Sequence, residues 1–540
     1  MAADRDLTAA DAYPLYDQAI TINTDSKPPS LVEELKNGAI STVKSASESS
    51  SLADEDVEKA VGLTLKVEDD GEKHDENLVT WDGPDDPKNP MNFSQAKKYG
   101  ILLTLATLSF IVPLASSMLA PGVPEMMEDL HSTSSLLSSL VISIYVLGFG
   151  VGPLVIAPLS ELYGRSFIYK ASTAVFAALT IVSGEINSMT GMMILRFICG
   201  FIGSTSLALG KGSVADLIPQ RERGKMLAIY TLGPVLGPAV GPVIGGFIAA
   251  VSWRWVFRIL GIASGIMCIC CIAFLPESYG PHLLRQKARR LRKETGNAQL
   301  YSIYEDRVSS PSRLFMRNII RPMKLLFGAP NVLLLSIYIA VSYGQMYLLF
   351  TTFTDVYEQQ YGFSTSTVGL AYLGLGVGNV AGLLMVILFS DKILLYLTSQ
   401  SADDEMKPEF RLPLLLILSP LHVIGMLIYG WTVYYKVHWI VPILSNVILG
   451  AGLFTSLNVT TSYLVDAYTI YAASATSASV ILRSIGGAFL PLAGGPMYDC
   501  LGYGWGNTLL AFIMVALIPL AWIMYFKGEM LRTRFAVKLD

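Results

Sequence analysis

Long apolar stretches separated by short polar ones make up most of the chain from Tyr99 to Phe526. A stretch of about 18 to 25 apolar residues is long enough to cross a hydrocarbon core about 30 Å thick. The pattern predicts twelve spans in two groups of six: 99–119, 136–158, 168–186, 191–214, 226–250 and 255–275, then 331–354, 367–389, 411–430, 438–463, 474–497 and 506–527. Six spans, a polar stretch and six more spans indicate an internal duplication. We therefore expect an all-α integral membrane protein.

Polar segments divide the chain around these spans. Residues 1–98 are rich in Ser, Asp, Glu and Lys, most clearly before residue 78, and are predicted to be a disordered acidic tail. Their apolar area is too small to offset the entropy of ordering. Residues 276–330 are predicted to be a basic central loop between bundles at 99–275 and 331–527, and residues 528–540 a short C-terminal tail.

The distribution of Lys and Arg predicts how the spans are oriented. Cytoplasmic loops carry an excess of these residues, and here they gather in the central loop and in the loops at 163–170 and 221–225. The loop PGVPEMMEDLHS has only acids, although Arg254, Arg258 and Lys436 fall on the outer side. An even number of spans then places both termini in the cytosol.

Composition narrows the possible functions. Hydrophobic residues make up 52% of the chain and charged residues 15%, whereas soluble domains have about 25% charged residues. The net charge of −4 combines an acidic tail with basic loops, so it does not indicate a nucleic-acid partner. The five cysteines have no metal-site or disulfide spacing. Without a phosphate-binding loop or a nucleophile motif, we expect no enzyme activity, no metal and no ATP-dependent step.

The fifth span contains the unusual stretch GPVLGPAVGPVIGG. Glycines recur every fourth position and form one stripe along the helix, and prolines form a second stripe beside it. Small residues at this spacing allow two helix backbones to approach closely in a membrane. The residues of the two stripes are Gly233, Pro234, Gly237, Pro238, Gly241, Pro242 and Gly245.

Charged residues inside or at the ends of spans are functional candidates, because a charge in the membrane is costly. Arg196 lies in the fourth span and Arg483 in the eleventh, whereas Lys211 lies near the cytosolic end of the fourth. A second group lies at the cytosolic ends of spans and predicts a charge network that opens and closes as a gate: Glu161, Arg165, Asp216, Arg221 and Arg223, with Asp391 and Asp466 at comparable positions in the second half.

Several stretches together resemble the major facilitator superfamily, in its fungal twelve-span drug/proton antiporter branch. GPVLGPAVGPVIGG resembles the antiporter signature of that branch, APLSELYGRS the family loop after the second span, and LRFICGFIGS its fourth-span motif. WDGPDDPKNPMNFS, WRWVFRI and SATSASVILRSIGGAFLPL are similar to fungal members. The continuation SFIY departs from the usual loop pattern. The resemblance extends over about residues 80 to 527.

The resemblance implies two six-helix bundles that rock around a central cavity, with the inward proton gradient driving export of an amphipathic compound. It implies that Arg196 takes part in proton transfer, that Glu161 caps helix contacts, and that the fifth-span motif lies between the halves and limits proton leak. The implied partners are a small organic substrate, protons and the bilayer, with no cofactor, in a monomer of the plasma membrane. Azoles, polyamines and cercosporin-like polyketide toxins remain open as substrates, as does location in a vesicular membrane.

The central cavity is expected to be lined by aromatic, Met and small polar residues, which suit bulky apolar solutes. The candidates are Ser117, Tyr145, Tyr343, Gln345, Met346 and Tyr347. Because no acid lies in the first span, the proton carrier stays open among Glu185, Asp355, Glu358 and His422. The absence of an acidic cavity favours a neutral or anionic substrate over a polyamine.

Two other functions fit the span pattern. The first is a proton symporter or facilitator that imports a nutrient, although the glycine–proline stripe argues against it. The second is a membrane sensor that binds a nutrient without transporting it, which the long polar tail permits.

Overall fold

The computed structural model describes residues 77–83, 85–302, 304, 311–401, 406–535 and 537, so most of the predicted tail (1–76) and Arg221's side chain lie outside the described residues. Residues from Val79 onward form one compact unit. In the described residues the only strands are β1 (Leu78–Val79) and β2 (Tyr301–Ser302), which form a two-stranded sheet. All other regular structure there is helical.

The first half of the unit contains six long helices and one short helix. Serine hydroxyls begin three of the long ones: Ser94, Ser188 and Ser252 accept backbone N–H groups from the first turns of α3, α7 and α9, as is typical of helix N-caps. The helices of this half are α3 (Gln95–Ser117), α4 (Val123–Asp129), α5 (Ser135–Tyr163), α6 (Arg165–Ser183), α7 (Met189–Leu217), α8 (Gln220–Ala249) and α9 (Trp253–Phe274).

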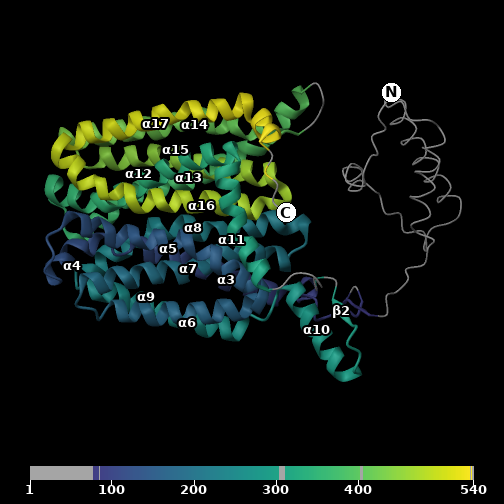
Figure 1. Cartoon of the computed structure of the whole chain (residues 1–540). Helices are drawn as coiled ribbons and strands as arrows, with labels where there is room; N and C mark the ends of the chain where they lie inside the picture. Colours follow the sequence, from purple (N-terminus) through teal and green to yellow (C-terminus); the bar gives the residue numbers. More distant parts are fainter. Residues whose placement is uncertain are drawn as a thin grey trace. The chain divides into compact units, whose positions relative to one another are not determined.

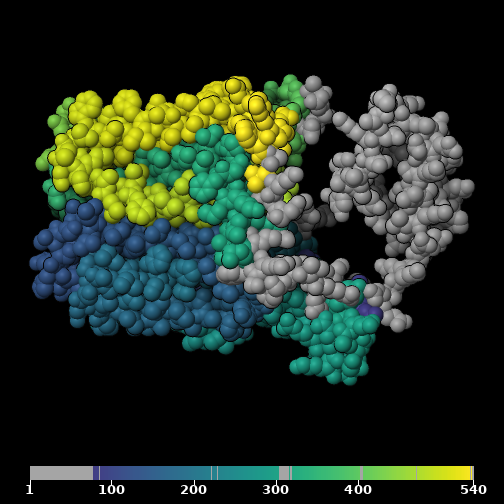
Figure 2. All heavy atoms as spheres, viewed as in Figure 1, coloured from purple at the N-terminus to yellow at the C-terminus, as the bar shows by residue number. Residues whose placement is uncertain are grey.

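The second half repeats the arrangement with six more long helices. In Figure 1 and Figure 2 the two halves form two adjacent layers of roughly parallel helices, the first half in blue and the second in green and yellow. The helices of the second half are α12 (Pro330–Tyr361), α13 (Thr365–Gln400), α14 (Leu412–Tyr434), α15 (Ile440–Tyr468), α16 (Ala472–Phe489) and α17 (Gly494–Arg534).

The last helical stretch contains two crossings. Among the described residues, eleven helices are long and apolar enough to span a membrane, and the last of these runs from Ala472 to Arg534. Its 63 residues would extend about 95 Å, three times the thickness of the hydrocarbon core. The chain reverses at Gly502, which has φ 69° and ψ 173°. These conformational angles favour glycine, and the reversal gives the twelve predicted crossings.

Contacts with α12 confirm the reversal at Gly502. Before it, Gly486 lies against Ala340 and Gly494 against Leu348, so the two segments run parallel. After it, the Gln345 side chain bonds to the Leu510 carbonyl and Ser342 contacts Met514, so the direction is reversed.

Two expected segment boundaries differ from the structure. The predicted tail extended to residue 98, whereas β1, a short 3₁₀ helix (Pro90–Asn92) and the start of α3 all precede that residue. Asp86 orders this segment by accepting the backbone N–H groups of Asp82 and Lys88. The expected central loop holds two helices, α10 (Gly280–Thr295) and α11 (Pro311–Gly328).

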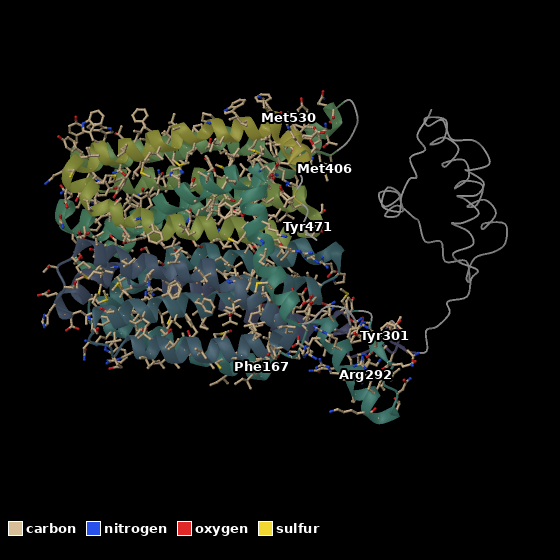
Figure 3. All side chains as sticks on the ribbon, in the orientation of Figure 1. Phe167, Arg292, Tyr301, Met406, Tyr471 and Met530 are labelled. Atoms are coloured by element: carbon tan, nitrogen blue, oxygen red, sulfur yellow. The ribbon has the colours of Figure 1, made fainter. Side chains whose placement is uncertain are left out.

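The outer faces of the bundle are apolar. Large hydrophobic side chains are exposed along most long helices; Phe167 of α6 is 60% exposed and Met530 of α17 is 49% exposed. Figure 3 shows such side chains projecting from the bundle. We call the end that carries α10 and the α5–α6 turn the basic end, and the end that carries α4 the acidic end.

The glycine stripe of α8 packs against α3, within the first half. A Cβ atom placed on Gly237 would lie 2.8 Å from the Phe110 carbonyl oxygen, and one on Gly245 would lie 1.9 Å from the Met118 carbonyl oxygen. The side chains of larger residues would therefore separate the two backbones. The opposite face of α8 contacts α13 of the second half, where Ala239 lies against Gly376. The helix thus lies between the halves, but its glycines face its own half.

Two serines of α3 replace donors that the α8 prolines lack. Pro234 has no N–H to offer the Tyr230 carbonyl. The Ser109 hydroxyl, which donates to the Ala106 carbonyl at 2.8 Å, also lies 3.3 Å from that carbonyl oxygen. Pro242 likewise leaves the Pro238 carbonyl free, and the Ser117 hydroxyl donates to it at 3.3 Å. In lipid such carbonyls must find partners inside the protein. The α3–α8 contact therefore gives a side-chain partner to two of the three carbonyls that the α8 prolines leave free.

We predict that Gly245→Leu lowers the free energy of unfolding by about 2 kcal/mol or more, because overpacking against backbone cannot be relieved by a rotamer change. The measurement is the thermal unfolding midpoint of the purified full chain in detergent. Gly265→Leu is the matched control, since no heavy atom lies within 4 Å of a Cβ there. Equal midpoints for the two variants would contradict the close α3–α8 contact.

Candidate transport site between the halves

Arg196 of α7 is buried and binds backbone carbonyls of two helices. Its guanidinium donates to the carbonyls of Val141 (3.1 Å), Ala115 (2.8 Å) and Ser116 (2.9 Å). Ala115 and Ser116 lie in the last turn of α3, where helix carbonyls have no intrahelical partner. Among the described residues no carboxylate pairs with Arg196. Its charge is therefore balanced by the C-terminal dipole of α3.

Tyr145 of α5 completes this arrangement. Its ring lies 4.6 Å from the Arg196 guanidinium carbon, and its hydroxyl donates to the Val112 carbonyl at 3.0 Å. Tyr145 is 1% exposed. It is a packing partner of Arg196, and its contact with substrate stays a prediction.

A polar and aromatic chain leads from Arg196 into the second half. The Ser116 hydroxyl lies 3.3 Å from the Tyr347 hydroxyl of α12. The rings of Tyr347 and Tyr343 are 5.1 Å apart, and the Arg483 guanidinium of α16 lies 4.6 Å from the Tyr343 ring centre. The structure thus brings together four predicted candidates, Arg196, Tyr343, Tyr347 and Arg483, along the boundary of the halves.

Three other cavity candidates lie in packed interiors. Ser117 bonds to α8, as described above. Gln345 points toward α17, where its Nε2 donates to the Leu510 carbonyl at 2.9 Å. Met346 is 4% exposed and belongs to an apolar core that includes residues of both halves. These positions correct the expectation that all three face the cavity, because residues on one apolar helix point to different neighbours.

The candidates for the proton carrier lie in different environments. Glu185 forms a surface ion pair with Arg258 (2.8 Å), and the hydrogen bonds from Arg258 lower the pKa of the Glu185 carboxyl. His422 is fully buried in the second half, and neither ring nitrogen bonds to a described residue. Asp355 and Glu358 lie near Glu125 toward the acidic end. The geometry therefore gives Glu185 a structural role and leaves the carrier open among the other three.

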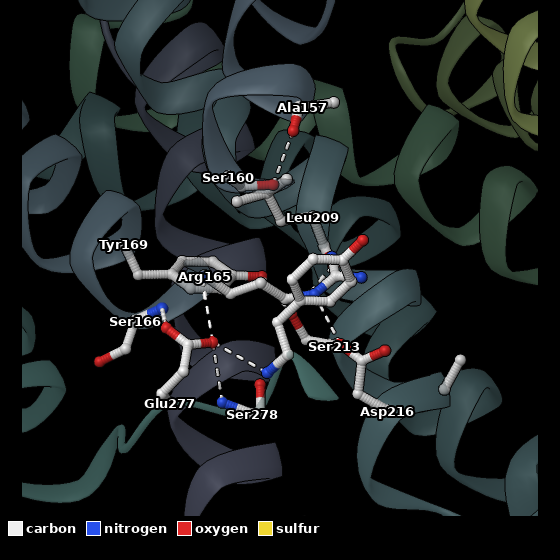
Figure 4. Close-up of polar contacts among 12 residues, drawn as sticks. Ala157, Ser160, Arg165, Ser166, Tyr169, Leu209, Ser213, Asp216, Glu277 and Ser278 are labelled. Carbon is white, nitrogen blue, oxygen red and sulfur yellow. Dashed lines mark hydrogen bonds and ion pairs between the residues drawn. The ribbon is translucent and has the colours of Figure 1, made fainter. Parts of the chain in front are cut away.

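An ion pair at the basic end joins two helices of the first half. Arg165, the first residue of α6, contacts Asp216 near the end of α7 with an Nε–Oδ2 distance of 2.6 Å. The Arg165 guanidinium also lies 5.0 Å from the Tyr279 ring centre. Figure 4 shows Arg165 and Asp216 near Tyr169 and Ser213, whose hydroxyl oxygens are 3.1 Å apart. This part of the predicted charge network is present.

Glu277, which sequence reasoning missed, caps α6. Its carboxylate accepts backbone N–H groups of Arg165 (3.1 Å), Ser166 (3.2 Å), Ser278 (3.0 Å) and Tyr279 (2.8 Å) (Figure 4). Gly164 precedes the helix with φ 92°, and a Cβ there would lie 2.2 Å from the Glu277 carboxylate. The sequence signal that could have identified this cap was an acidic residue just after the sixth predicted span.

Glu161 lies near the end of α5 and Arg223 near the start of α8. Glu161 is exposed, and its backbone carbonyl accepts the Arg285 guanidinium. The cap at the start of α6 is formed by Glu277. Arg223 donates to the Ala215 carbonyl at 3.1 Å and so closes the end of α7.

The second half contains an equivalent network at the basic end. Arg411, which precedes α14, bonds to Asp391 of α13 (2.9 Å) and to Asp466 of α15. This arrangement repeats that of Arg165 and Asp216, so the internal duplication includes the charges at the helix ends. At the acidic end, the outer arginines are neutralised instead: Arg254 pairs with Asp129 (2.8 Å).

Twelve crossings in two equivalent halves, with ion pairs at the helix ends and cations along the boundary, define a multi-pass membrane transporter. Residues 105–491 match the model of the Major Facilitator Superfamily, and the chain belongs to that family.

Similar proteins support this assignment. The MFS-type transporter penM of Penicillium rubens is 47% identical, with 85% of this chain and 90% of that protein covered. The efflux pump radE of Floropilus chiversii is 44% identical, with 89% and 90% covered. Among solved structures, a partially occluded inward-open form of the xylose transporter XylE from E. coli has a TM-score of 0.60 at 17% identity, covering 80% of this chain and 98% of that one. The last likeness shows the fold.

We predict that Glu277→Gln lowers the free energy of unfolding by about 2 kcal/mol, because the backbone N–H groups lose a charged acceptor. The measurement is the unfolding midpoint of the purified full chain. Glu294→Gln is the control, since its carboxylate forms only an exposed pair with Arg290 within α10. A midpoint no lower than that of the control would show that the α6 cap is dispensable.

Proposed function

We propose that this transporter exports an amphipathic organic compound, such as a toxin, secondary metabolite or drug, in exchange for protons. The observation that carries the proposal is the position of α8. Its glycine–proline stretch is packed against α3 on one face and α13 of the other half on the opposite face, and this stretch resembles the signature of proton-coupled antiporters. The relative named as an efflux pump, 44% identical, also supports export.

The contacts between the halves favour an inward-facing state. Among the described residues, the hydrogen bonds that join the two halves lie toward the acidic end. They link Ser116 to Tyr347, Thr354 to the Ala120 carbonyl (3.1 Å) and Thr365 to Glu125 (3.4 Å). We assign the basic end to the cytosol of the plasma membrane, with both termini there, since cytoplasmic loops are rich in Lys and Arg. In that orientation the substrate enters from the cytosol of a monomeric transporter.

Transport then requires the halves to rock about the boundary. The ion pairs Arg165–Asp216 and Arg411–Asp391 bind helices within each half, so each half moves as one body. Arg196 holds α3, α5 and α7 together through its three hydrogen bonds. It also places a positive charge beside the Ser116–Tyr347 contact that must break when the acidic end opens. A proton arriving near that contact is expected to change its strength.

We predict protonophore-sensitive efflux from a pump-deficient yeast strain that expresses the chain and is loaded with aromatic toxins, azoles or polyamines. Arg196→Ala is expected to reduce efflux at least tenfold, because the carbonyls of α3 lose their donors. Arg258→Ala, which removes an exposed surface pair, is the control. Efflux that the protonophore does not reduce would contradict this proposal. Net uptake that the proton gradient strengthens would instead indicate an importer.

A further inference from the structure

Helix α10, at the basic end, presents three cations to solvent on one side. Arg289, Arg290 and Lys293 are all exposed, and the helical repeat of 3.6 residues places them within about a third of the circumference of the helix. Among the described residues, Arg290 has one exposed ionic partner, Glu294 at 3.4 Å, and the other two cations have none. We call these three residues the cationic face of α10.

The opposite side of α10 is fixed to the first half of the protein. Leu284 is buried there, and the Arg285 guanidinium donates to the Glu161 carbonyl near the end of α5. The Lys287 ammonium donates to the Thr80 carbonyl, in the segment before α3, at 2.7 Å. Because these contacts hold the helix from behind, the cationic face keeps a fixed direction relative to the bundle.

Exposed aromatic residues mark the level of the membrane surface beside α10. Tyr163 and Phe167 are 58% and 60% exposed, and their ring centres lie 6.4 Å apart. Exposed tyrosines are typical of the membrane–water interface, and Tyr163 is only two residues beyond Glu161, to which α10 is bonded. The helix therefore begins near the headgroups, and Figure 1 shows that it extends from there past the edge of the bundle beside α6.

The charges on α10 repel one another. Arg289 lies four residues from both Arg285 and Lys293, a spacing at which like charges destabilise a helix. An anionic surface beside the cationic face would replace this repulsion with attraction. Anionic headgroups of the cytoplasmic leaflet provide such a surface, and they attract Lys and Arg residues close to the membrane.

The composition of this surface favours lipid over a protein partner. No large hydrophobic side chain of α10 is exposed among the described residues. The centre of a protein interface is normally depleted in charge and rich in aromatic side chains. A surface with cations and without apolar residues instead suits headgroups, whose charge it contacts without entering the hydrocarbon region.

We propose that the cationic face of α10 binds anionic phospholipid headgroups of the leaflet at the basic end. This inference goes beyond the proposed function: the assignment of that leaflet to the cytosol rests on it, whereas the binding itself does not. Because α10 is bonded to α5 and to the segment before α3, bound lipid anchors the first half of the protein to the membrane surface.

The test measures how close α10 lies to the headgroups. A bimane fluorophore is attached at Gln286→Cys, an exposed position within the arc of the three cations, in a Cys500→Ser background that lacks the exposed native cysteine. The full chain is placed in phosphatidylcholine nanodiscs with or without phosphatidylserine, and a phosphatidylcholine with a spin-labelled headgroup is the quencher. The background without Gln286→Cys supplies the blank. We expect at least twofold stronger quenching with phosphatidylserine.

Two changes should remove this increase. Replacing Arg289, Arg290 and Lys293 together by Gln removes the charge, whereas Arg289→Lys, Arg290→Lys and Lys293→Arg together keep it and form the matched control. The Gln variant should quench equally in both lipids, and the control should retain the increase. High salt should also abolish the increase in the wild-type chain, because at 1 M salt the screening length falls to about 3 Å.

Two results would overturn the lipid proposal directly: equal quenching of the wild-type chain in both lipids, or an increase that the Gln variant retains. A third result would assign the face to an acidic protein instead. In that case bimane emission would respond to added poly-glutamate and not to phosphatidylserine.

Discussion

Backbone carbonyls inside a bilayer cannot accept hydrogen bonds from water. The rest of this structure depends on how the carbonyls at α3 find other donors. The last carbonyls of α3, at Ala115 and Ser116, are bound by Arg196. Two of the carbonyls that prolines free in α8 are contacted by Ser109 and Ser117 of α3. Because lipid offers no alternative partner, these contacts fix α3, α7 and α8 as one group. The α8 glycines make the group possible by letting the backbones touch, and the opposite face of α8 is left for the second half.

The placement of charge follows a consistent physical rule. Ion pairs at the basic end join neighbouring helices of one half, as in Arg165–Asp216 and Arg411–Asp391. Arg196 lies deeper and is bound by helix carbonyls, which supply partial negative charge without a carboxylate. Arg483, at the boundary, lies against the Tyr343 ring, and its Nε bonds to none of the described groups. The charges that hold neighbouring helices together are thus compensated within one half.

Hydropathy predicted the crossings well because each crossing must be long and apolar. Both properties can be seen in a local stretch of sequence. It also predicted the twelfth crossing, where a turn at Gly502 interrupts an otherwise continuous helix. The directions in which side chains point were harder to predict from the sequence. Met346 and Tyr347 are adjacent in α12 and both buried, and the Tyr347 hydroxyl contacts Ser116 of the first half. On a helix that is apolar on every face, no periodicity marks the cavity side. The cap by Glu277 was missed for a related reason, since it joins residues more than a hundred positions apart.

The charge of the substrate determines how much of the membrane potential an antiporter can use. One elementary charge crossing 100 mV contributes about 2.3 kcal/mol. If one proton enters as one organic anion leaves, two positive charges move inward, which contributes about 4.6 kcal/mol, or about three powers of ten in concentration ratio. A neutral substrate would gain half of that, and a monovalent cation none. An anionic cargo would therefore gain most from the membrane potential of a cell with a negative interior, because its exit and the entry of the proton move charge in the same sense.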